Sequence, residues 1–318
     1  MVASCLAAGR HLALSYIIQM NDQPWWRGAD PGHRLTGKRA FVTGAGTAPG
    51  GDLLGIGEAI AVLFAIQGAR VAVADVSGER AKATVGLIND AGAEGVAVVG
   101  DLSREADNAR CVEEAIRALG GLDTVVNNVA LSGGGGSPAT VDLEVWEHVM
   151  AVNVRAAMLT ARHAIPHLKR AGGGSIINVS SVAATRALGA GAYAASKAAI
   201  QALTRDWALL HGRDHIRANC IVIGHAYTPM GTTDEAGRER RRLASLLGTE
   251  GVAWDIAWPA VFLASEESRW ISGVDLPVDG GATATTALGI HMLNRSGRTD
   301  GELGPSIPPS TSSTSPVT

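Results

Sequence analysis

Cysteine, net charge and long hydrophobic runs are all scarce in this sequence of 318 residues. The three cysteines, Cys5, Cys111 and Cys220, are odd in number and far apart, which excludes a disulfide framework and favours a reducing, cytoplasmic compartment. Lys and Arg number 27 against 30 Asp and Glu, and the resulting charge of −3 offers no basic surface to nucleic acid. No apolar run reaches the roughly 18 residues that span a bilayer, so we expect no membrane partner.

The two ends of the chain differ in composition from its middle. Residues 1–34 form an extension that we expect to be partly ordered. Residues 284–318 are expected to be a C-terminal tail, largely disordered from about Asn294, because they are rich in Ser, Thr, Pro and Gly and contain little to bury. One domain over residues 35–283 remains, and its fold should not require residues 1–34 or 294–318.

Within that domain, short apolar runs alternate with longer amphipathic segments. The short runs are rich in Val and Ile, which suits strands covered by helices on both faces, and the longer segments space their apolar residues as helices do. The alternation predicts one α/β domain with a doubly wound, parallel sheet of about seven strands. The expected strands are 39–43, 70–75, 95–101, 123–128, 175–181, 216–222 and 273–279, and the expected helices after the first are 78–90, 103–119, 141–170, 191–211 and 253–265.

A glycine-rich turn, TGAGTAPGGDLLGIG, joins the first expected strand to the first helix. Gly44, Gly55 and Gly57 would let backbone N–H groups approach a pyrophosphate, whose charge the helix N-terminus stabilises. Asp75 ends the second strand 18 residues past Gly57, where its carboxylate can accept hydrogen bonds from an adenosine ribose. The turn therefore predicts a dinucleotide site, and the alternative is an ordinary glycine-rich turn.

A second group of residues predicts proton transfer at a hydroxyl or carbonyl group. Tyr193 and Lys197 stand four apart on an expected helix and share one face, so the ammonium would favour the phenolate and lower the tyrosine pKa. Ser180 and Ser181 end the preceding expected strand, at the edge where open α/β sheets bind ligands. Together these side chains predict a general acid/base centre. The alternative for Tyr193 and Lys197 alone is a solvated helix face.

Further short motifs follow in order along the chain, and with the glycine turn and YAASK they resemble the classical short-chain dehydrogenase/reductase family over residues 35–283. The resemblance implies a single Rossmann-type domain, hydride transfer with NAD(P), a homotetramer and a Ser–Tyr–Lys centre aided by an Asn. The motifs are DL at 101–102, NNVA at 127–130, VNV at 152–154, SS at 180–181, IGHAYTPM at 223–230 and LPVDGG at 276–281.

The resemblance implies catalytic roles for Ser181, Tyr193, Lys197 and Asn153. Tyr193 would carry the proton and Lys197 would lower its pKa and hold the ribose hydroxyls. Ser181 would hydrogen-bond the substrate oxygen, and Asn153 would position a water that links Lys197 to solvent. No metal is implied, and structural hydrogen bonding is the alternative role for Asn153 and Asn128. The implied cofactor-binding residues are Gly44, Gly55, Ile56, Gly57, Asp75, Asp101, Leu102, Asn128, Tyr193, Lys197 and Thr228.

Two departures from the family pattern affect this site. The glycine turn is seven residues longer than the family's usual turn, and the extra residues are placed most simply at 47–53. The family's usual spacing between the catalytic serine and the tyrosine selects Ser180, whereas the sequence motif NVSSVA selects Ser181. We prefer Ser181, because the loop that follows changes length more easily than the end of a strand.

The sequence thus predicts an NAD-dependent oxidoreductase that interconverts a secondary alcohol and a ketone. Asp75 would repel the 2′-phosphate of NADP, and no basic residue follows it before Arg80. We expect an apolar or alicyclic substrate because its pocket would be lined by Ala184, Leu188, His225 and Met230. The alternatives are an NADPH-type ketoreductase of a biosynthetic pathway and a dinucleotide-binding subunit without turnover.

Overall fold

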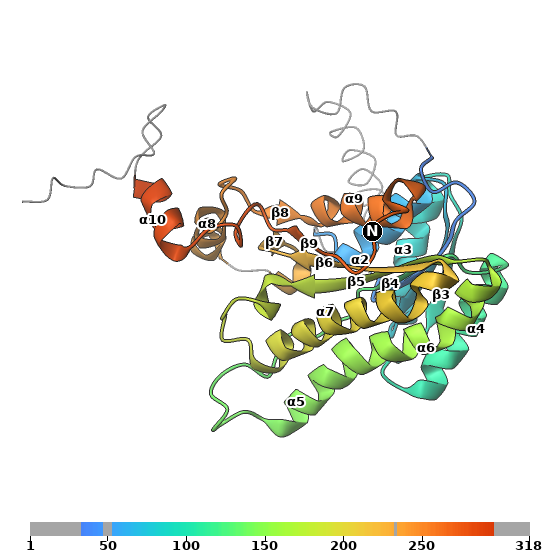
Figure 1. Cartoon of the computed structure of the whole chain (residues 1–318), viewed down its shortest axis with the longest axis horizontal. Helices are drawn as coiled ribbons and strands as arrows, with labels where there is room; N and C mark the ends of the chain where they lie inside the picture. Colours follow the sequence, from blue (N-terminus) through green and yellow to red (C-terminus); the bar gives the residue numbers. More distant parts are fainter. Residues whose placement is uncertain (1–32, 47–52, 232–233, 296–318) are drawn as a thin grey trace, which may run out of the picture.

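Seven parallel strands form the central sheet of the computed structural model, which describes residues 33–46, 53–231 and 234–295 (Figure 1). The strand order is β3-β2-β1-β4-β5-β6-β9, and every neighbouring pair is parallel. The predicted doubly wound α/β fold is thereby confirmed. The strands are β1 (Arg39–Thr43), β2 (Arg70–Asp75), β3 (Gly95–Val99), β4 (Thr124–Asn127), β5 (Gly174–Ser181), β6 (Ile216–Ile223) and β9 (Asp275–Val278).

Helices cover both faces of the sheet, and each layer has its own apolar core. One layer consists of α2 (Ile56–Ile66), α3 (Gly78–Asp90) and α9 (Ala253–Ala264), and the other of α4 (Glu105–Leu119), α6 (Ala156–Arg170) and α7 (Gly191–His211). Because the strands are apolar on both sides, their successive residues enter the two cores alternately, as Phe41 and Val42 of β1 do.

The expected helix over 141–170 is divided by one π-helical turn. Asp142 caps α5 (Leu143–Met150) by accepting hydrogen bonds from the backbone N–H groups of Glu144 and Val145. The π turn at Ala151–Arg155 then leads into α6. It contains Asn153, and turns of this kind concentrate at functional sites.

Several elements lie outside the expected series. They are β7 (Ala226–Tyr227) and β8 (Gly251–Val252), which form a small sheet, the helices α8 (Glu235–Leu243) and α10 (Ala287–Arg295), and 3-10 turns at Val182–Ala184, Gly212–Asp214, Pro229–Gly231 and Glu266–Ser268. Residues 1–32, almost all of the inserted 47–53 segment and the tail beyond 295 lie outside the described residues. None of the described helices is long and apolar enough to cross a membrane.

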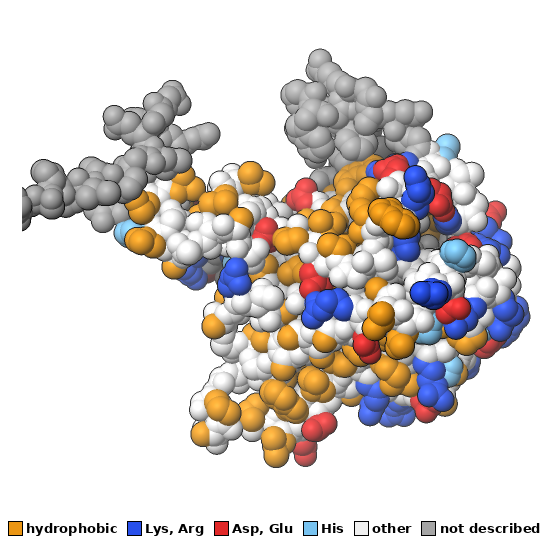
Figure 2. All heavy atoms as spheres, in the orientation of Figure 1, with side chains coloured by type: hydrophobic (Ala, Val, Ile, Leu, Met, Phe, Trp, Pro, Cys, Tyr) orange, Lys and Arg blue, Asp and Glu red, His pale blue; other side chains and the backbone are white. Residues whose placement is uncertain are grey.

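The sheet changes direction between β1 and β4, because the chain winds outward from β1 to β3 and then returns to continue through β4. At such a switch point the loops at the carboxyl ends of the strands separate and leave a crevice. Residues Gly44, Asp75, Asn128 and Ser181 all stand at this edge. On the face drawn in Figure 2, Lys and Arg side chains are interspersed with Asp and Glu.

Candidate active site

The glycine turn after β1 packs so closely that two of its positions have no room for a side chain. Gly44 has φ +61°, and a Cβ there would lie 2.6 Å from Val129 Cα. A Cβ on Gly57 would lie 2.4 Å from Asn128 Nδ2 and 2.5 Å from the Gly44 carbonyl oxygen. The first turn of α2, which begins at Ile56, is thus held directly against the ends of β1 and β4.

Asn128 fastens β4 to the turn. Its Nδ2 donates hydrogen bonds to the carbonyl oxygens of Thr43 (3.0 Å) and Gly44 (2.9 Å), and its backbone N–H donates to Thr43 Oγ1. These contacts match the structural alternative for Asn128 and place its side chain beside the glycine turn. Gly55, just before α2, donates its N–H to the buried carboxylate of Glu58 at 3.1 Å.

Asp75 lies at the end of β2 and is 8% exposed. Its Oδ1 accepts from Ser77 N (2.9 Å) and from Arg80 Nε (3.1 Å) and Nη2 (2.7 Å), and its Oδ2 accepts from Gly46 N (3.2 Å). Arg80 is therefore a direct partner of Asp75. Arg80 was expected only as the first basic residue after Asp75, but its place in the first turn of α3 brings its side chain back to the Asp75 carboxylate.

Three other expected cofactor residues lie along the same edge. Asp101 accepts hydrogen bonds from Ser103 Oγ (2.6 Å) and N (3.0 Å), and these bonds lower the pKa of the Asp101 carboxyl. Leu102 is buried beside it. Thr228 is buried after β7, and its carbonyl oxygen accepts from Gly231 N.

Tyr193 and Ser181 meet where α7 begins and β5 ends. The Tyr193 hydroxyl is hydrogen-bonded to the Ser181 side chain, and Ser181 Oγ also accepts from Ala183 N at 3.2 Å. Burial raises the pKa of Tyr193, and the hydrogen bond with Ser181 acts in the opposite direction but is the smaller effect. The phenol is therefore protonated at neutral pH.

Lys197 lies one helical turn further along α7 and is 3% exposed. Its Nζ donates to the carbonyl oxygen of Val179 at 2.8 Å and lies 5.6 Å from the centroid of the Tyr193 ring. Burial lowers the pKa of Lys197 to about 8. Lys197 was expected to lower the pKa of Tyr193, but in the structure that pKa is raised, since burial penalises the phenolate more strongly than its neighbours favour it.

Ser180 and Ser181 point to opposite faces of the sheet, as consecutive residues of a strand must. Ser180 is buried, and its Oγ donates to the carbonyl oxygen of Lys197 at 2.9 Å. Ser181 is the one of the two that contacts the phenol of Tyr193.

Asn153 ties the π turn to the start of α7. Its Oδ1 accepts from Leu131 N (2.7 Å), and its Nδ2 donates to Leu131 O (2.9 Å) and Ser196 Oγ (2.9 Å). Ser196 in turn donates to the carbonyl oxygen of Tyr193 at 2.7 Å. This chain of bonds supports the turn of helix that carries Tyr193 and Lys197. Ser196 stands inside the YAASK motif but was not among the expected site residues.

A cavity of about 440 Å³ is lined by Val182, the residue after Ser181, but not by Ser181, Tyr193 or Lys197. Its lining is mostly apolar and comes from the segment after β5, from the loop after β6, from the end of α8 and from the chain after β9. The lining residues are Val182, Arg186, Leu188, His225, Ala244, Ala282, Thr283, Thr285, Thr286, Ala287 and Ile290.

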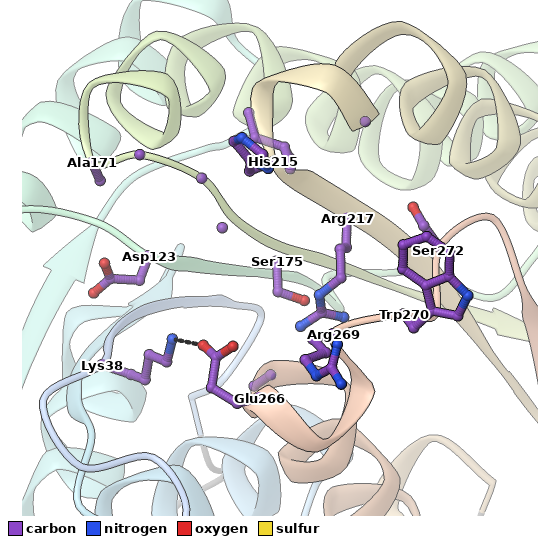
Figure 3. A pocket seen from close by; sticks show the side chains of 16 residues that line it. Lys38, Asp123, Ala171, Ser175, His215, Arg217, Glu266, Arg269, Trp270 and Ser272 are labelled. Carbon is purple, nitrogen blue, oxygen red and sulfur yellow. Dashed lines mark hydrogen bonds and ion pairs between the residues drawn. The ribbon is translucent and has the colours of Figure 1, made fainter.

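Another cavity, of about 620 Å³, lies at the opposite edge of the sheet, where β5 and β6 begin (Figure 3). Ser175 and Arg217 line it, whereas Ser181 stands at the other end of β5. Three of its charged groups are engaged within the protein, because Lys38 pairs with Glu266 at 2.7 Å and Arg217 donates to carbonyl oxygens at the end of α9. This cavity is separate from the reacting groups. Among the described residues, no group of three or more His, Cys, Asp or Glu could hold a metal ion.

Comparison with curated proteins relates the chain to dehydrogenases. A family model described as enoyl-(acyl carrier protein) reductase matches residues 51–283. The chain is 36% identical over 251 residues to 2,5-dichloro-2,5-cyclohexadiene-1,4-diol dehydrogenase LinX of Sphingobium indicum, covering 78% of this chain and 97% of that protein. It is 37% identical over 274 residues to (+)-borneol dehydrogenase 2 of Salvia officinalis, covering 79% and 91%.

Solved structures give the same relationship. A short-chain dehydrogenase/reductase from Burkholderia xenovorans matches with a TM-score of 0.75 and 35% identity, over 80% of this chain and 99% of that one. A gluconate 5-dehydrogenase from Burkholderia cenocepacia, in complex with NADP and tartrate, matches with a TM-score of 0.74 and 28% identity, over 80% and 98%. The resemblance found in the sequence motifs is confirmed, and the chain belongs to the short-chain dehydrogenase/reductase family.

Proposed function

We propose that the protein is an NAD-dependent dehydrogenase that interconverts an alicyclic secondary alcohol and its ketone. The observation that carries the proposal is the contact between the Tyr193 hydroxyl and the Ser181 side chain, with Lys197 buried beside the ring. These groups can bind one oxygen atom and move one proton to or from it. LinX and borneol dehydrogenase 2 are themselves named for alicyclic alcohols.

The residues at the glycine turn fit a dinucleotide. Gly44 and Gly57 have no room for a Cβ, so the first turn of α2 stands directly against the ends of β1 and β4, where its backbone N–H groups would bind a pyrophosphate. Asp75 presents its carboxylate at the end of β2, where it would accept from the adenosine ribose, with Asp101, Leu102 and Thr228 further along the edge. When bound, the nicotinamide would accept or supply the hydride.

The chain's own residues would manage the proton. Ser181 would hold the substrate oxygen, and Tyr193 would take its proton during oxidation or return it during reduction. Lys197, charged below a pKa of about 8, would stabilise the phenolate that forms and hold the ribose hydroxyls. Asn153 would keep α7 in position and carry a water toward Lys197.

Two other functions are open to the same fold. An NADPH-type ketoreductase would use the same four side chains in the reductive direction, whereas a dinucleotide-binding subunit without turnover would need Lys197 for the ribose but would need neither Ser181 nor a proton on Tyr193. The pairing of Tyr193 with Ser181 favours an enzyme, because a binding subunit gains nothing from a half-buried phenol that contacts a serine hydroxyl.

Turnover with a panel of secondary alcohols tests the proposed function. We expect NADH formation with cyclohexanol and borneol at rates above those with straight-chain alcohols, because the cavity that Val182 lines has a volume of about 440 Å³ and a mostly apolar lining. The absence of NAD-linked turnover with every alcohol, and of NADH oxidation with every ketone, would contradict a dehydrogenase. Binding of NAD without turnover would favour the non-catalytic subunit.

Cofactor preference is expected to favour NAD over NADP by at least about tenfold in kcat/KM, equivalent to about 1.4 kcal/mol. The Asp75 carboxylate would repel a 2′-phosphate, although its ion pair with Arg80 at 2.7 Å offsets part of that charge. Asp75→Ala should narrow the ratio by weakening NAD binding and removing the repulsion. Steady-state kinetics with both cofactors measure it, and a wild-type enzyme that prefers NADP would support the ketoreductase instead.

We also propose a cytoplasmic homotetramer. The large apolar side chains of Leu209 and Leu210 on α7 and Met158 on α6 are exposed in the single chain. A second copy packed on these helices would bury them, and closed symmetric assemblies are the usual way in which soluble chains do so.

A further inference from the structure

The cavity that Val182 lines is bounded on one side by a helix that the family match does not include. The match ends at residue 283, whereas Thr285, Thr286, Ala287 and Ile290 from the following segment and α10 line the cavity. We propose that α10 is a wall of the substrate pocket, and that Ile290 and Ala287 limit the size of the ring that the pocket accepts. This inference rests on the proposed function and names a substrate-selecting element within it.

Hydrogen bonds fix this wall at both ends. Asp279, just after β9, accepts from Gly281 N (2.9 Å) and from Thr283 N (2.8 Å) and Oγ1 (2.6 Å), which shapes the turn that leads to α10. At the far end, Asn294 Nδ2 donates to the carbonyl oxygen of Leu243 at 3.0 Å and joins α10 to α8. In Figure 1 the two helices lie side by side, beyond the carboxyl ends of the strands.

A hydrogen bond also connects the chain just before α10 to the opposite wall of the cavity. Arg186, from the segment after Ser181, donates through Nη2 to the carbonyl oxygen of Thr283 at 3.0 Å and through Nη1 to Thr185 O at 3.0 Å. Val182 and Leu188 of that segment face the cavity together with Ile290. The wall formed by α10 therefore keeps a defined distance from the residues next to Ser181.

The lining selects for uncharged, apolar ligands. Burial and the nearby Arg241 lower the pKa of His225, so this side chain is neutral at neutral pH. The guanidinium of Arg186 is already bonded to two carbonyl oxygens, and the other lining side chains are aliphatic or threonine. A volume of about 440 Å³ lies within the range of small-molecule pockets and accommodates one or two fused or bridged carbon rings.

The two sides of α10 differ, which supplies a matched control. Ile290 is half-buried against the cavity, whereas Leu288 on the same helix is 67% exposed and does not line it. A tryptophan at Ile290 or Ala287 would fill the cavity, while a tryptophan at Leu288 would extend away from it. Figure 2 shows hydrophobic side chains on the outer surface of α10.

Calorimetric titration of ketones into the full-length enzyme tests the inference. The enzyme is saturated with NAD⁺, because the oxidised cofactor cannot reduce a ketone and only binding is then measured. The probes are camphor, a bicyclic ketone, and cyclohexanone, a single ring. We expect Ile290→Trp and Ala287→Trp to raise the Kd of camphor by at least about tenfold and that of cyclohexanone by less than about threefold. Leu288→Trp should leave both within about twofold. Thermal melting verifies that each variant is folded, and Ile290→Phe serves if Ile290→Trp is not.

The outcomes separate the inference from the function on which it rests. Equal effects of the three tryptophan variants, or a wild-type complex that does not bind camphor, would overturn the role of α10. The expected binding pattern together with a complete absence of hydride transfer would leave α10 as a ligand wall and remove the proposed dehydrogenase activity.

Discussion

Replacing Tyr193 by phenylalanine is expected to lower kcat for alcohol oxidation by at least about 10², while NAD still binds. The substitution removes the hydroxyl that meets Ser181 and leaves the ring that packs beside Lys197. Steady-state rates measure the loss, and fluorescence titration with NADH shows that the cofactor site is intact. Tyr227→Phe is a suitable control, because Tyr227 packs against Arg238 at 3.9 Å from its ring centroid and should keep near-normal activity.

The pH dependence gives this prediction a second readout. Burial raises the pKa of Tyr193, so the phenolate that accepts the alcohol proton becomes more populated as the pH rises. Oxidation should therefore accelerate from pH 7 toward pH 8, where Lys197 with its pKa of about 8 still carries its charge, and ketone reduction, which needs the protonated phenol, should not. Near-normal turnover in Tyr193→Phe, or an oxidation rate that falls over this range, would contradict the assigned proton carrier.

The strands could be predicted well from the sequence because their signal is local. Residues 39–43 and 70–75 were expected as strands and form β1 and β2 with the same bounds. Both are short Val- and Ala-rich runs whose residues are nearly all buried, and the runs end at the glycine turn and at Asp75. Burial on both faces leaves little choice of conformation or position for such a run.

Elements that depend on tertiary contacts escaped prediction. The spacing of apolar residues over 141–170 is helical throughout, but the π turn around Asn153 depends on bonds to Leu131 and Ser196, which come from other parts of the chain. Likewise, α10 contains Gly289 and follows a Thr-rich segment, so its local propensity is weak. Its position depends on the contact of Asn294 with α8.

Among the site residues, too, the features set by local sequence were predictable and those set by tertiary contacts were not. Their order and spacing were enough to bring Ser181, Tyr193 and Lys197 to one edge, since the carboxyl end of β5 and the first turns of α7 follow from the fold. Their pKa values were not predictable, because the spacing of Tyr193 and Lys197 indicates that the ammonium lies near the phenol but does not indicate how deeply either group is buried. The ion pair between Asp75 and Arg80 was missed for a similar reason, since it requires the geometry of the first turn of α3.

Ser181→Ala is expected to lower kcat/KM by about 10², whereas Ser180→Ala should lower it by less than about threefold. The two expected losses differ because the Ser180 and Ser181 side chains point to opposite faces of the sheet. Ser181 Oγ contacts the phenol that moves the proton, while Ser180 Oγ is buried and donates to the carbonyl oxygen of Lys197. Loss of the latter bond should appear in stability, with about 0.5–1.5 kcal/mol less free energy of unfolding.

Steady-state kinetics and urea unfolding on the two variants, measured in parallel, separate these effects. A kinetic loss in Ser181→Ala with an unchanged unfolding midpoint indicates a group that acts on the substrate, because the Ser181 side chain is not part of the buried core. Ser180→Ala is the control: it shows how much kcat/KM falls when a neighbouring buried hydroxyl and its structural hydrogen bond are lost. A larger kinetic loss at Ser180 than at Ser181 would show that the spacing to Tyr193, and not the NVSSVA motif, identifies the catalytic serine. The contact between Ser181 and Tyr193 would then be a feature of the cofactor-free chain only.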